Sequence, residues 1–338
     1  MRHGRRPAPA EPHRQAPTGR LVEVACDESG SEGENLVGGN TDVFAHASVR
    51  LSAESAANCI EEIRGRIRSP ALEYKANHLL REKHRPVLTW LLGPSGPILG
   101  QAHVHLTDKA FFVVDRVVEV LAGAGAAAGA ARTLYREGPR AFGRDRWRAF
   151  LEASNALVRT RSRWDAGTSV DSFFRVVEAL RDDADAGPAG AVLELLRQAR
   201  PRADAFRARL EEDPGLVPAL DPLLPAIARA VAYWGQDKTP VSVVHDQHVA
   251  LTADRVAQLE ALLGAPPGGR LAGLRLVDSR SDARVQVADF LAGVARKIAS
   301  DELNHRGDAE LTGLLRPYVD ASSTWGDERS WSLLGPRR

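Results

Sequence analysis

The chain has 338 residues, of which 43% are hydrophobic, and a formal net charge of +1 at neutral pH. A chain of this length and composition can bury a full hydrophobic core, as one large domain or two smaller ones. Its balanced charge excludes a global field that would draw the molecule onto nucleic acid, so any such contact needs a local patch. Two cysteines, Cys26 and Cys59, are too few for a disulfide framework, and we expect a reducing, cytoplasmic setting.

The N-terminal 20 residues are rich in Pro and Arg and contain no apolar run. We expect residues 1–20 to form a disordered tail and not a secretory signal. The least polar long stretch, 121–131, consists mainly of Ala and Gly and is too short to span a bilayer, so no membrane segment is expected.

Hydrophobic patterning predicts an α/β region, a long helical stretch and a second α/β region. Strands are expected over 21–26, 43–51, 98–106, 241–245 and 274–277. Helices are expected over 252–263 and after the capping candidates Ser52 or Ser55, Thr107 or Asp108, and Ser281 or Asp282. We therefore divide the chain into an α/β core (21–122 and 238–300), a helical insertion (123–237) and a C-terminal extension (301–338).

Two of the expected strands end in an aspartate: Asp27 follows LVEVAC and Asp246 follows VSVVH. In an open α/β sheet, ligands gather outside the carboxyl ends of the strands, so these two acids would face one site. The alternative is that each is an ordinary turn or helix-capping residue.

A third aspartate, Asp289, lies inside the otherwise apolar helical run RVQVADFLAG. A carboxylate in such surroundings is costly unless it is paired, hydrogen-bonded or bound to a metal. Gln286, Gly293 and either Arg296 or Lys297 share its helix face, and the small residues around it allow the helix to lie close to a sheet. The alternative is an interior aspartate that is bonded to backbone amides.

Three carboxylates that lie close together repel one another and raise their own pKa values unless cations neutralise them. Oxygen ligands select Mg²⁺ or Mn²⁺, and two such ions about 4 Å apart activate water and stabilise the leaving oxygen of a phosphodiester. If Asp27, Asp246 and Asp289 meet, their chemistry favours a metal-dependent nuclease.

The segment Glu73-Tyr74-Lys75 places an acid and a base two residues apart, on one side of an extended chain. Glu73 is a candidate fourth metal ligand, and Lys75 is a candidate contact to phosphate or to the transition state. Lys109, just after the third expected strand, is a second candidate phosphate contact. The alternatives are a solvated Glu–Lys surface pair and a helix-capping lysine.

Together these features resemble an uncharacterised bacterial family known as domain of unknown function 3800. The resemblance rests on DESG at 27–30, the E-x-K motif at 73–75, the lysine at 109, a late strand that ends in Asp246, and VQVADFLAG at 285–293. It covers roughly residues 20–110 and 238–300 and leaves the helical middle unmatched. Members are regarded as ribonuclease H-like, so the resemblance implies a ribonuclease H-like mixed sheet with flanking helices, interrupted here by a large helical insertion.

Carried over residue by residue, the resemblance implies a site made of Asp27, Glu28, Glu73, Lys75, Lys109, Asp246, Gln286 and Asp289. A ribonuclease H core takes one acid from its first strand, one from a middle strand and one from its last helix, which are the positions of the three aspartates. The acid that such enzymes carry on their first helix is missing here, and Glu73, Asp115 or Glu119 is a candidate for its place. Glu28 and Gln286 are supporting residues.

Other polar clusters have competing interpretations. His103 and His105 would face one side of a strand as metal ligands, but without a third ligand at recognisable spacing, surface or core histidines fit better. His245 and His248 flank the acid of the fourth strand and are candidates for positioning it or for proton transfer. The stretch 132–164 is dense in Arg and contains aromatic residues, as a nucleic-acid-binding surface would, or as solvated helices with buried Trp would.

The sequence therefore leads to two hypotheses. The first is a nuclease that hydrolyses phosphodiester bonds of RNA or DNA with two Mg²⁺ or Mn²⁺ ions, whose expected ligands are Asp27, Glu73, Asp246 and Asp289. The second is a non-catalytic binding or scaffold protein that keeps the fold, with acids that serve structural hydrogen bonds.

Overall fold

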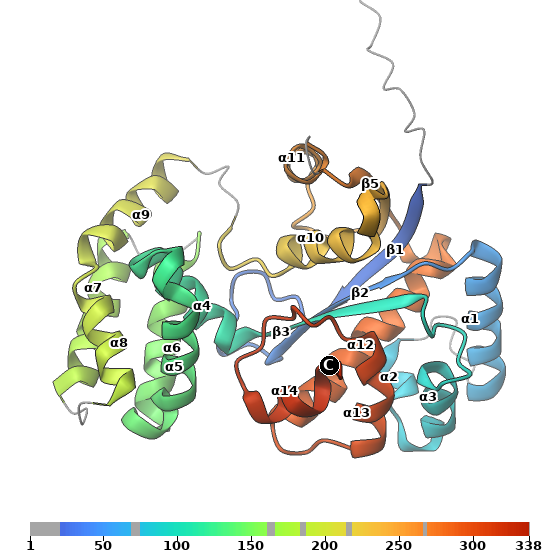
Figure 1. The fold of residues 1–338 in the computed structure, drawn as a ribbon, viewed down its shortest axis with the longest axis horizontal. Helices are drawn as coiled ribbons and strands as arrows, with labels where there is room; N and C mark the ends of the chain where they lie inside the picture. Colours follow the sequence, from blue (N-terminus) through green and yellow to red (C-terminus); the bar gives the residue numbers. More distant parts are fainter. Residues whose placement is uncertain are drawn as a thin grey trace, which may run out of the picture.

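The structure is a computed structural model that describes residues 21–68, 75–160, 166–182, 187–213, 218–265 and 269–337. Within these residues the protein is mixed α/β: a five-stranded sheet lies between helices, and a bundle of helices stands to one side of it (Figure 1). None of the described helices is both long and apolar enough to cross a membrane.

The sheet has the strand order β3-β2-β1-β4-β5. Its strands are β1 (Val22–Ser29), β2 (Val43–Val49), β3 (Ala102–Asp108), β4 (Val241–Asp246) and β5 (Leu271–Val277). β2 runs antiparallel to β1 and β3, whereas β4 runs parallel to β1 and β5 runs parallel to β4. Apolar and β-branched residues dominate these segments, as buried strands require. The carboxyl ends of β1, β4 and β5 therefore share one edge of the sheet.

Alternate residues of the central strands point to opposite faces of the sheet. Ala25 of β1 and Val244 of β4 belong to the hydrophobic core on one face. Their neighbours Cys26 and Val243 belong to the core on the other face. This alternation decides which side chain at each strand end meets which layer of helices.

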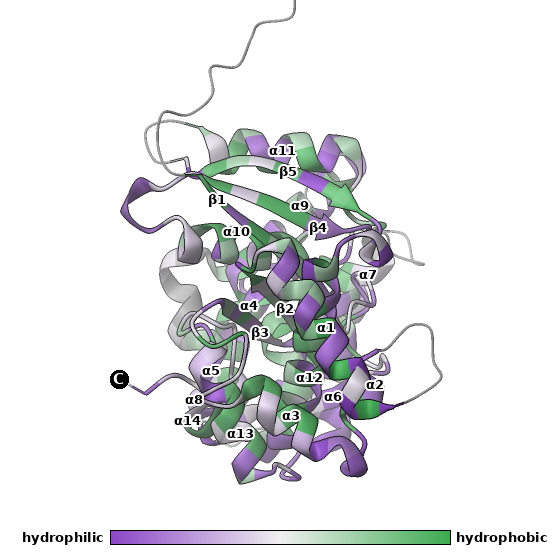
Figure 2. Cartoon of the chain, turned by 90° about the vertical axis from the view of Figure 1, so that its right-hand side faces the viewer, coloured by the Kyte–Doolittle hydropathy of each residue, from purple (hydrophilic) through white to green (hydrophobic). Residues whose placement is uncertain are grey.

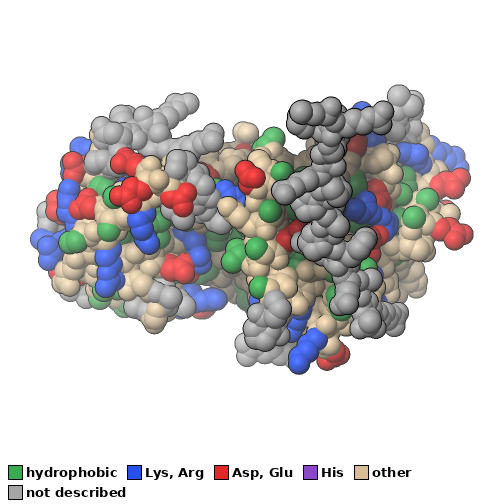
Figure 3. All heavy atoms as spheres, turned by 90° about the horizontal axis from the view of Figure 1, so that it is seen from above, with side chains coloured by type: hydrophobic (Ala, Val, Ile, Leu, Met, Phe, Trp, Pro, Cys, Tyr) green, Lys and Arg blue, Asp and Glu red, His purple; other side chains and the backbone are tan. Residues whose placement is uncertain are grey.

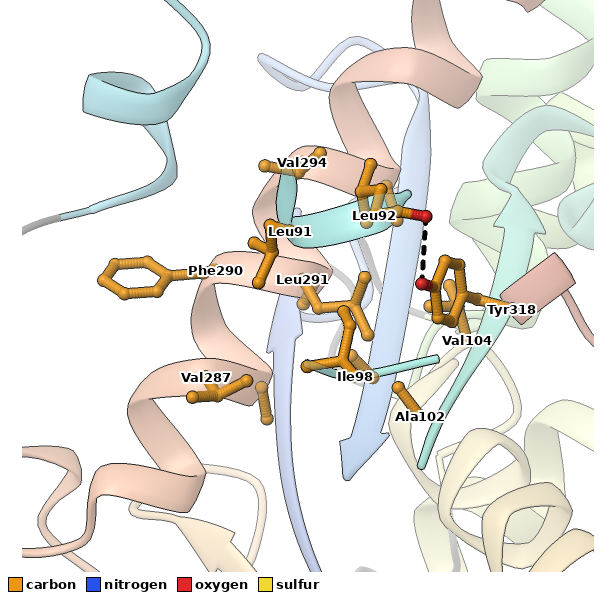
Figure 4. Close-up of a cluster of buried hydrophobic side chains, with 14 of the residues drawn as sticks. Leu91, Leu92, Ile98, Ala102, Val104, Val287, Phe290, Leu291, Val294 and Tyr318 are labelled. Carbon is orange, nitrogen blue, oxygen red and sulfur yellow. Dashed lines mark hydrogen bonds between the residues drawn. The ribbon is translucent and has the colours of Figure 1, made fainter. Parts of the chain in front are cut away.

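The first face is covered by a layer of helices around the long helix α12, which packs on β1 and β2 (Figure 2). The layer contains α1 (Ala53–Ile67), α2 (Ala76–Leu79), η1 (Glu82–His84), α3 (Arg85–Leu92) and α12 (Ala283–Leu303). Leu291 of α12 and Leu91 of α3 are completely buried in it (Figure 4). The hydroxyl of Tyr318 donates to the carbonyl of Leu92 at 3.0 Å in the same cluster. Each fully buried side chain of this kind contributes about 1.5–3 kcal/mol to folding.

The second face is covered by α10 (Leu223–Trp234) and α11 (Ala253–Gly264). Ile227 of α10 is buried in the same core as Val24 and Phe44 of the sheet. Two short 3-10 helices flank the strands of this half: η2 (Gln236–Lys238) precedes β4, and η3 (Ser279–Ser281) follows β5.

A bundle of helices with a hydrophobic core of its own lies beside the sheet (Figure 1). It consists of α4 (Lys109–Ala122), α5 (Ala124–Phe142), α6 (Arg144–Val158), α7 (Ala166–Asp182), α8 (Pro188–Arg197) and α9 (Arg200–Glu212). Gly123 and Gly143 separate the first three helices at φ values of 85° and 81°. Glycine adopts this backbone region without a steric cost, so each helix can end there and the next can turn back.

The C-terminal residues complete the layer around α12. They form α13 (Ala309–Leu315), η4 (Arg316–Tyr318) and α14 (Glu328–Leu334). Between these helices, Val319 bridges to Val104 and Thr324 bridges to Thr107 of β3. The segment therefore covers an edge of the sheet that would otherwise offer backbone groups to another chain.

The hydrophobic cores divide the chain at different residues from those expected. α4 lies within the expected core segment 21–122 but packs in the bundle, and α10 lies within the expected insertion 123–237 but packs on the sheet. The described part of 301–338, expected as an extension, belongs to the core around α12. The hydrophobic patterns of these segments predict amphipathic helices. Such a pattern alone does not indicate against which core the apolar side packs.

Local signals located the helix starts well. Ser52, Asp108 and Asp282 are the N-caps of α1, α4 and α12, and each side chain accepts a hydrogen bond from a backbone N–H of the first turn. The third strand begins at Ala102, later than expected, because residues 98–101 form a turn.

Candidate active site

Two aspartates lie at the carboxyl ends of the neighbouring parallel strands β1 and β4. Asp27 is two residues beyond Ala25, and Asp246 is two residues beyond Val244, so both side chains belong to the face that carries α12. Asp27 is only 5% exposed, and its Oδ1 accepts a hydrogen bond from the backbone N–H of Glu28 at 2.8 Å. The two strand-end acids therefore share one edge and one face of the sheet.

α12 brings the third aspartate to this edge because it lies unusually close to its neighbours. A Cβ atom at Gly293 would be 2.3 Å from the Cβ of Ala76 on α2 and 3.9 Å from Oγ of Ser29 on β1. One turn earlier, Asp289 lies beside Lys75, the N-cap residue of α2, with 3.3 Å between Nζ and Oδ2. The absence of a side chain at Gly293 thus sets the distance at which Asp289 meets the strand ends.

The four carboxyl groups of Asp27, Glu28, Asp246 and Asp289 act on one another, and we call these residues the carboxylate cluster. Burial, together with the carboxyl groups of its three neighbours, raises the pKa of Asp27 to about 9. Burial, and next the carboxyl groups of Asp246 and Asp289, raise the pKa of Glu28 to about 7, against the effect of a hydrogen bond from Asp27. At neutral pH the cluster therefore retains a proton on Asp27 unless a cation replaces it.

Asp246 is held in place from α12 by way of a loop. Its Oδ1 accepts a hydrogen bond from the backbone N–H of Ser279 at 2.9 Å, and Nε2 of Gln286 donates to the carbonyl of Ser279 at 3.0 Å. Gln286, expected as a supporting residue, thus acts on the site through Ser279. No residue-type signal in the sequence marks Ser279, because both contacts use its backbone.

Glu28 points to the opposite face of the sheet from Asp27 and meets two histidines there. His248 Nε2 lies 3.6 Å from Glu28 Oε1 and 3.0 Å from Oγ of Ser31. His245 Nε2 lies 3.9 Å from Glu28 Oε2, while its Nδ1 bonds to its neighbour's backbone carbonyl at 2.9 Å. Burial lowers the pKa of His245 to about 4, so its ring is neutral at neutral pH. Both histidine rings therefore lie beside Glu28, and the buried Nε2 of His245 has no hydrogen-bond partner among the described residues.

The loop that follows β1 is held by two basic residues. Nε of Arg296 donates to Oγ of Ser29 at 2.9 Å, so of the two basic candidates on α12 it is Arg296 that reaches the DESG segment. Nζ of Lys109 donates to Oε2 of Glu32 and to Oγ1 of Thr41, both at 2.6 Å, and its side chain is 1% exposed. Lys109 was expected to contact phosphate. This arrangement instead favours a structural role, in which Lys109 holds the loop in place.

Of the three candidates for the missing fourth acid, the two that the structure describes do not join the cluster. Glu73 lies outside the described residues. Asp115 and Glu119 lie on α4, where they pair with Arg116 at 2.6 and 2.5 Å. Neither of these two is among the groups whose charge raises the pKa of Asp27. Within the described residues, Glu28 is the fourth carboxyl group of the site.

The histidines of β3 are core residues. His103 Nε2 lies 2.9 Å from Oδ2 of Asp320, and its ring stacks on Tyr233 with 4.1 Å between the centroids. His105 Nδ1 lies 4.0 Å from the same carboxylate oxygen. Both histidines are at most 2% exposed, and the hydrogen bond between His103 and Asp320 attaches the C-terminal segment to the sheet.

The described part of 132–164 differs from the expected nucleic-acid-binding surface. Trp147 is 7% exposed and stacks inside the bundle core, so its ring is not open to a nucleobase. Arg148 pairs with Glu152 at 2.9 Å, and Trp164 lies outside the described residues. Acidic and basic side chains are interspersed over the face of the molecule seen in Figure 3.

The donors of the carboxylate cluster can be compared with the needs of a metal ion. They are carboxylate oxygens, which Mg²⁺ and Mn²⁺ prefer, and the buried Oε2 of Glu28 has no hydrogen-bond partner among the described residues. A divalent cation would also remove the repulsion that raises the pKa of Asp27. However, no three His, Cys, Asp or Glu side chains in the described ranges are arranged to hold a metal ion as they stand. The donor chemistry fits, and binding would need the carboxylates to rotate toward a common point.

No protein-family model, curated protein or solved structure matches this chain. The ribonuclease H-like assignment and the nuclease activity therefore stay predictions. Because fold alone does not determine function, the chemistry of the site has to carry any functional proposal.

Proposed function

We propose that this protein is a divalent-metal-dependent phosphodiester hydrolase, a nuclease that acts on RNA or DNA and has a ribonuclease H-like core. The observation that carries the proposal is the carboxylate cluster, in which four acids from β1, β4 and α12 act on one another, Asp27 is buried and the other three are partly buried, and the pKa of Asp27 is raised to about 9. Strongly perturbed pKa values cluster at functional sites, and sites for Mg²⁺ or Mn²⁺ require such a set of oxygen donors. The mixed sheet between helices, with acids on its first strand, a middle strand and a late helix, also agrees with the resemblance.

Each residue of the cluster has a role in this proposal. Asp27, Asp246 and Asp289 would hold Mg²⁺ or Mn²⁺, which when bound supply an activated water and stabilise charge on the phosphodiester. Lys75 is half-exposed, with 51% of its side chain accessible, and it would contact a phosphate oxygen beside Asp289. Gln286 positions Asp246 by bonding to Ser279, whose backbone N–H holds the Asp246 carboxylate.

The first experiment is a calorimetric titration of the full chain with Mn²⁺, for the wild type and for Asp289→Asn. We expect the substitution to weaken Mn²⁺ binding at least tenfold and to abolish the cleavage of labelled RNA and DNA oligonucleotides, because it removes one charged ligand. Asp301→Asn is the matched control: Asp301 is on the same helix, pairs with Lys297, and should bind Mn²⁺ as the wild type does. Full cleavage by Asp289→Asn would contradict the proposal.

A scaffold protein is the second candidate, and two observations favour it. Lys75 already partners Asp289, and no three acids of the described residues converge on one point. In that case the wild type would bind no Mn²⁺ even at millimolar concentration, and Asp289→Asn would change only the melting temperature. The same titration therefore separates the two candidates.

A further inference from the structure

A groove of about 570 Å³ lies between the end of α1 and the start of α3, on the layer of helices around α12. α1 contributes Glu62 and Arg66 to its walls, the C-cap of α1 contributes Arg68, and the chain after α2 contributes Lys83, Pro86 and Val87. The charged residues of this wall are three cations and one acid. We call it the basic groove.

The acid of the basic groove is already neutralised. Oε1 of Glu62 accepts from Nε of Arg66 at 2.7 Å, and the guanidinium of Arg66 lies 4.6 Å from the ring centroid of Trp90. Arg68 and Lys83 are exposed, and neither has an ion-pair partner within the described ranges. Among the described residues, the groove therefore presents two cations without an ion-pair partner and a third that is held in place.

A further cation, Arg81, lies near Lys83, and both act on the neighbouring His84. Burial lowers the pKa of His84, and the cations Lys83 and Arg81 lower it further. The net charge of the whole chain is close to zero, so it cannot attract a polyanion by itself. Binding of a polyanion therefore requires a local positive potential of this kind. The charge of the groove thus favours an anionic ligand.

The basic groove and the carboxylate cluster flank the short helix α2. Arg68 is the C-cap of α1, whereas Lys75 is the N-cap of α2 and contacts Asp289. The two caps are seven positions apart in the sequence, so their Cα atoms are at most about 25 Å apart even in a fully extended chain. A nucleic-acid strand advances about 3.4 Å per nucleotide in a duplex, so a strand of several nucleotides spans this distance.

We propose that the basic groove binds the sugar–phosphate backbone of the nucleic-acid strand that is cleaved at the carboxylate cluster, an inference that rests on the proposed function. Its cations are two arginines and a lysine, side chains that commonly contact phosphate oxygens. The apolar wall of Pro86 and Val87 offers no hydrogen bond to a base edge. The groove therefore binds different sequences with similar affinity and sets the position of the strand, while cleavage occurs at the cluster.

The test measures binding of fluorescent 15-nucleotide RNA and DNA strands and duplexes by anisotropy, in EDTA so that no cleavage occurs. The variant Arg68→Gln with Lys83→Gln removes both of these cations, and both side chains are exposed, so folding should be unaffected. We expect about tenfold weaker binding at 0.1 M salt for every sequence, and a salt dependence whose slope falls by about 1.4 for single strands and 1.8 for duplexes.

Lys238→Gln is the matched control. Lys238 is an exposed lysine in η2, just before β4 begins, whereas Asp246 is the last residue of β4. It therefore lies at the opposite end of the strand from the carboxylate cluster. Its removal should change affinity less than twofold, and melting curves of all variants should match that of the wild type.

Three results would overturn the inference: no binding by the wild type, wild-type affinity in the double variant, or an equal loss in Lys238→Gln. Its failure is distinguishable from failure of the proposed function. Cleavage with Mn²⁺ that the double variant leaves unchanged refutes the groove alone. Strand binding that depends on Arg68 and Lys83, without cleavage in any divalent cation, refutes the nuclease and retains the groove.

Discussion

Asp27 lies almost completely buried at the end of β1, with three other carboxyl groups around it. A position with these surroundings stabilises the protonated acid and penalises the carboxylate, because burial removes hydration and the neighbours add repulsion. An asparagine or a hydrophobic residue would suit the fold better. The presence of an ionisable group here is therefore a clue to function and has a consequence for stability.

We expect the cation-free protein to lose stability as the pH rises from about 4 to 9. The pKa of Asp27 is raised to about 9 in the folded protein, so over this window the folded state binds more protons than the unfolded state, and unfolding becomes more favourable with increasing pH. Asp27→Asn should flatten this dependence and raise the melting temperature at pH 8 by a few degrees, equivalent to about 1–2 kcal/mol.

Melting curves from pH 4 to 9, with EDTA and with Mn²⁺, provide the measurement for Asp27. Mn²⁺ should restore the wild-type stability at high pH and should not affect Asp27→Asn, because the cation replaces the proton only on the carboxylate. A wild-type melting temperature that rises steadily toward pH 9 in EDTA would show that Asp27 does not hold a proton in the folded state.

Gln286 gives a second expectation at the scale of one residue. Gln286→Ala removes the hydrogen bond to the carbonyl of Ser279 and so frees the loop whose N–H holds Asp246. We expect Mn²⁺ affinity to fall about tenfold to a hundredfold, as it does when residues that orient metal ligands are removed. Gln286→Glu keeps the size of the side chain but has no amide N–H to donate, so it should lose a similar amount of Mn²⁺ affinity. Equal Mn²⁺ affinity in both variants and the wild type would exclude a role for Gln286 in positioning Asp246.

At the scale of elements, the site depends on how closely α12 approaches α2 and β1. The approach is possible because Gly293 has no side chain where it meets Ala76. The helix is anchored at its start by the N-cap Asp282 and is buried along most of its length, so it cannot easily move away as a rigid rod. The position of Asp289 relative to the strand ends is thus a property of helix packing.

Gly293→Ala should disturb this packing, because the new Cβ atom would lie 2.3 Å from that of Ala76. We expect a loss of about 1–3 kcal/mol in the free energy of unfolding and weaker Mn²⁺ binding, since α12 must shift. Adding Ala76→Gly to this variant removes the clash and should recover most of the Mn²⁺ affinity.

Gly313→Ala is the control for that substitution. Gly313 is also a helical glycine, on α13, and nothing lies within 4 Å of a Cβ atom placed there. Its replacement should stabilise the protein by about 0.5–1 kcal/mol, as for an open helical position. Equal stability of Gly293→Ala and the wild type in chemical denaturation would show that α12 has more room than the structure indicates.

At the scale of the whole molecule, the chain builds the site in one part and a separate bundle in another. The bundle core around Phe150 is distinct from the cores on the two faces of the sheet. The two parts are joined where β3 runs directly into α4, whose N-cap is the last residue of β3, and where the loop after β1 places Leu36 in the bundle core and bonds to Asn155 of α6. We expect a perturbation inside the bundle core, away from these two junctions, to leave the carboxylate cluster nearly unchanged.

Phe150→Ala tests this separation by making a cavity in the bundle, which should cost about 3–5 kcal/mol there. We expect faster hydrogen exchange over α5 to α9 and a change of less than threefold in Mn²⁺ affinity. Leu291→Ala makes a comparable cavity beside α12 and should weaken Mn²⁺ binding as well. If Phe150→Ala weakens Mn²⁺ binding as strongly as Leu291→Ala does, the bundle and the site are coupled.

Short-range patterns in the sequence were enough to place the strand ends, the helix caps and the acids on them. Asp27 and Asp246 directly follow runs of strand-forming residues, and Ser52 and Asp282 precede helical runs, so each depends only on its neighbours in the chain. The common edge of Asp27 and Asp246 was also predictable, because parallel strands expose their carboxyl ends at one edge, whereas the place of Asp289 beside them depends on how α12 packs. These features follow from local backbone geometry.

Other features were decided only when distant segments came together. The burial of Lys109 against Glu32, the contact of Ser279 with Asp246, and the position of Trp147 inside the bundle depend on residues far away in the sequence. The assignment of α4 to the bundle and of α10 to the sheet likewise depends on which core each apolar side meets. A sequence determines by itself the local conformation and the faces of its elements, whereas the partners of those faces are selected by packing, which minimises exposed apolar surface over the whole chain.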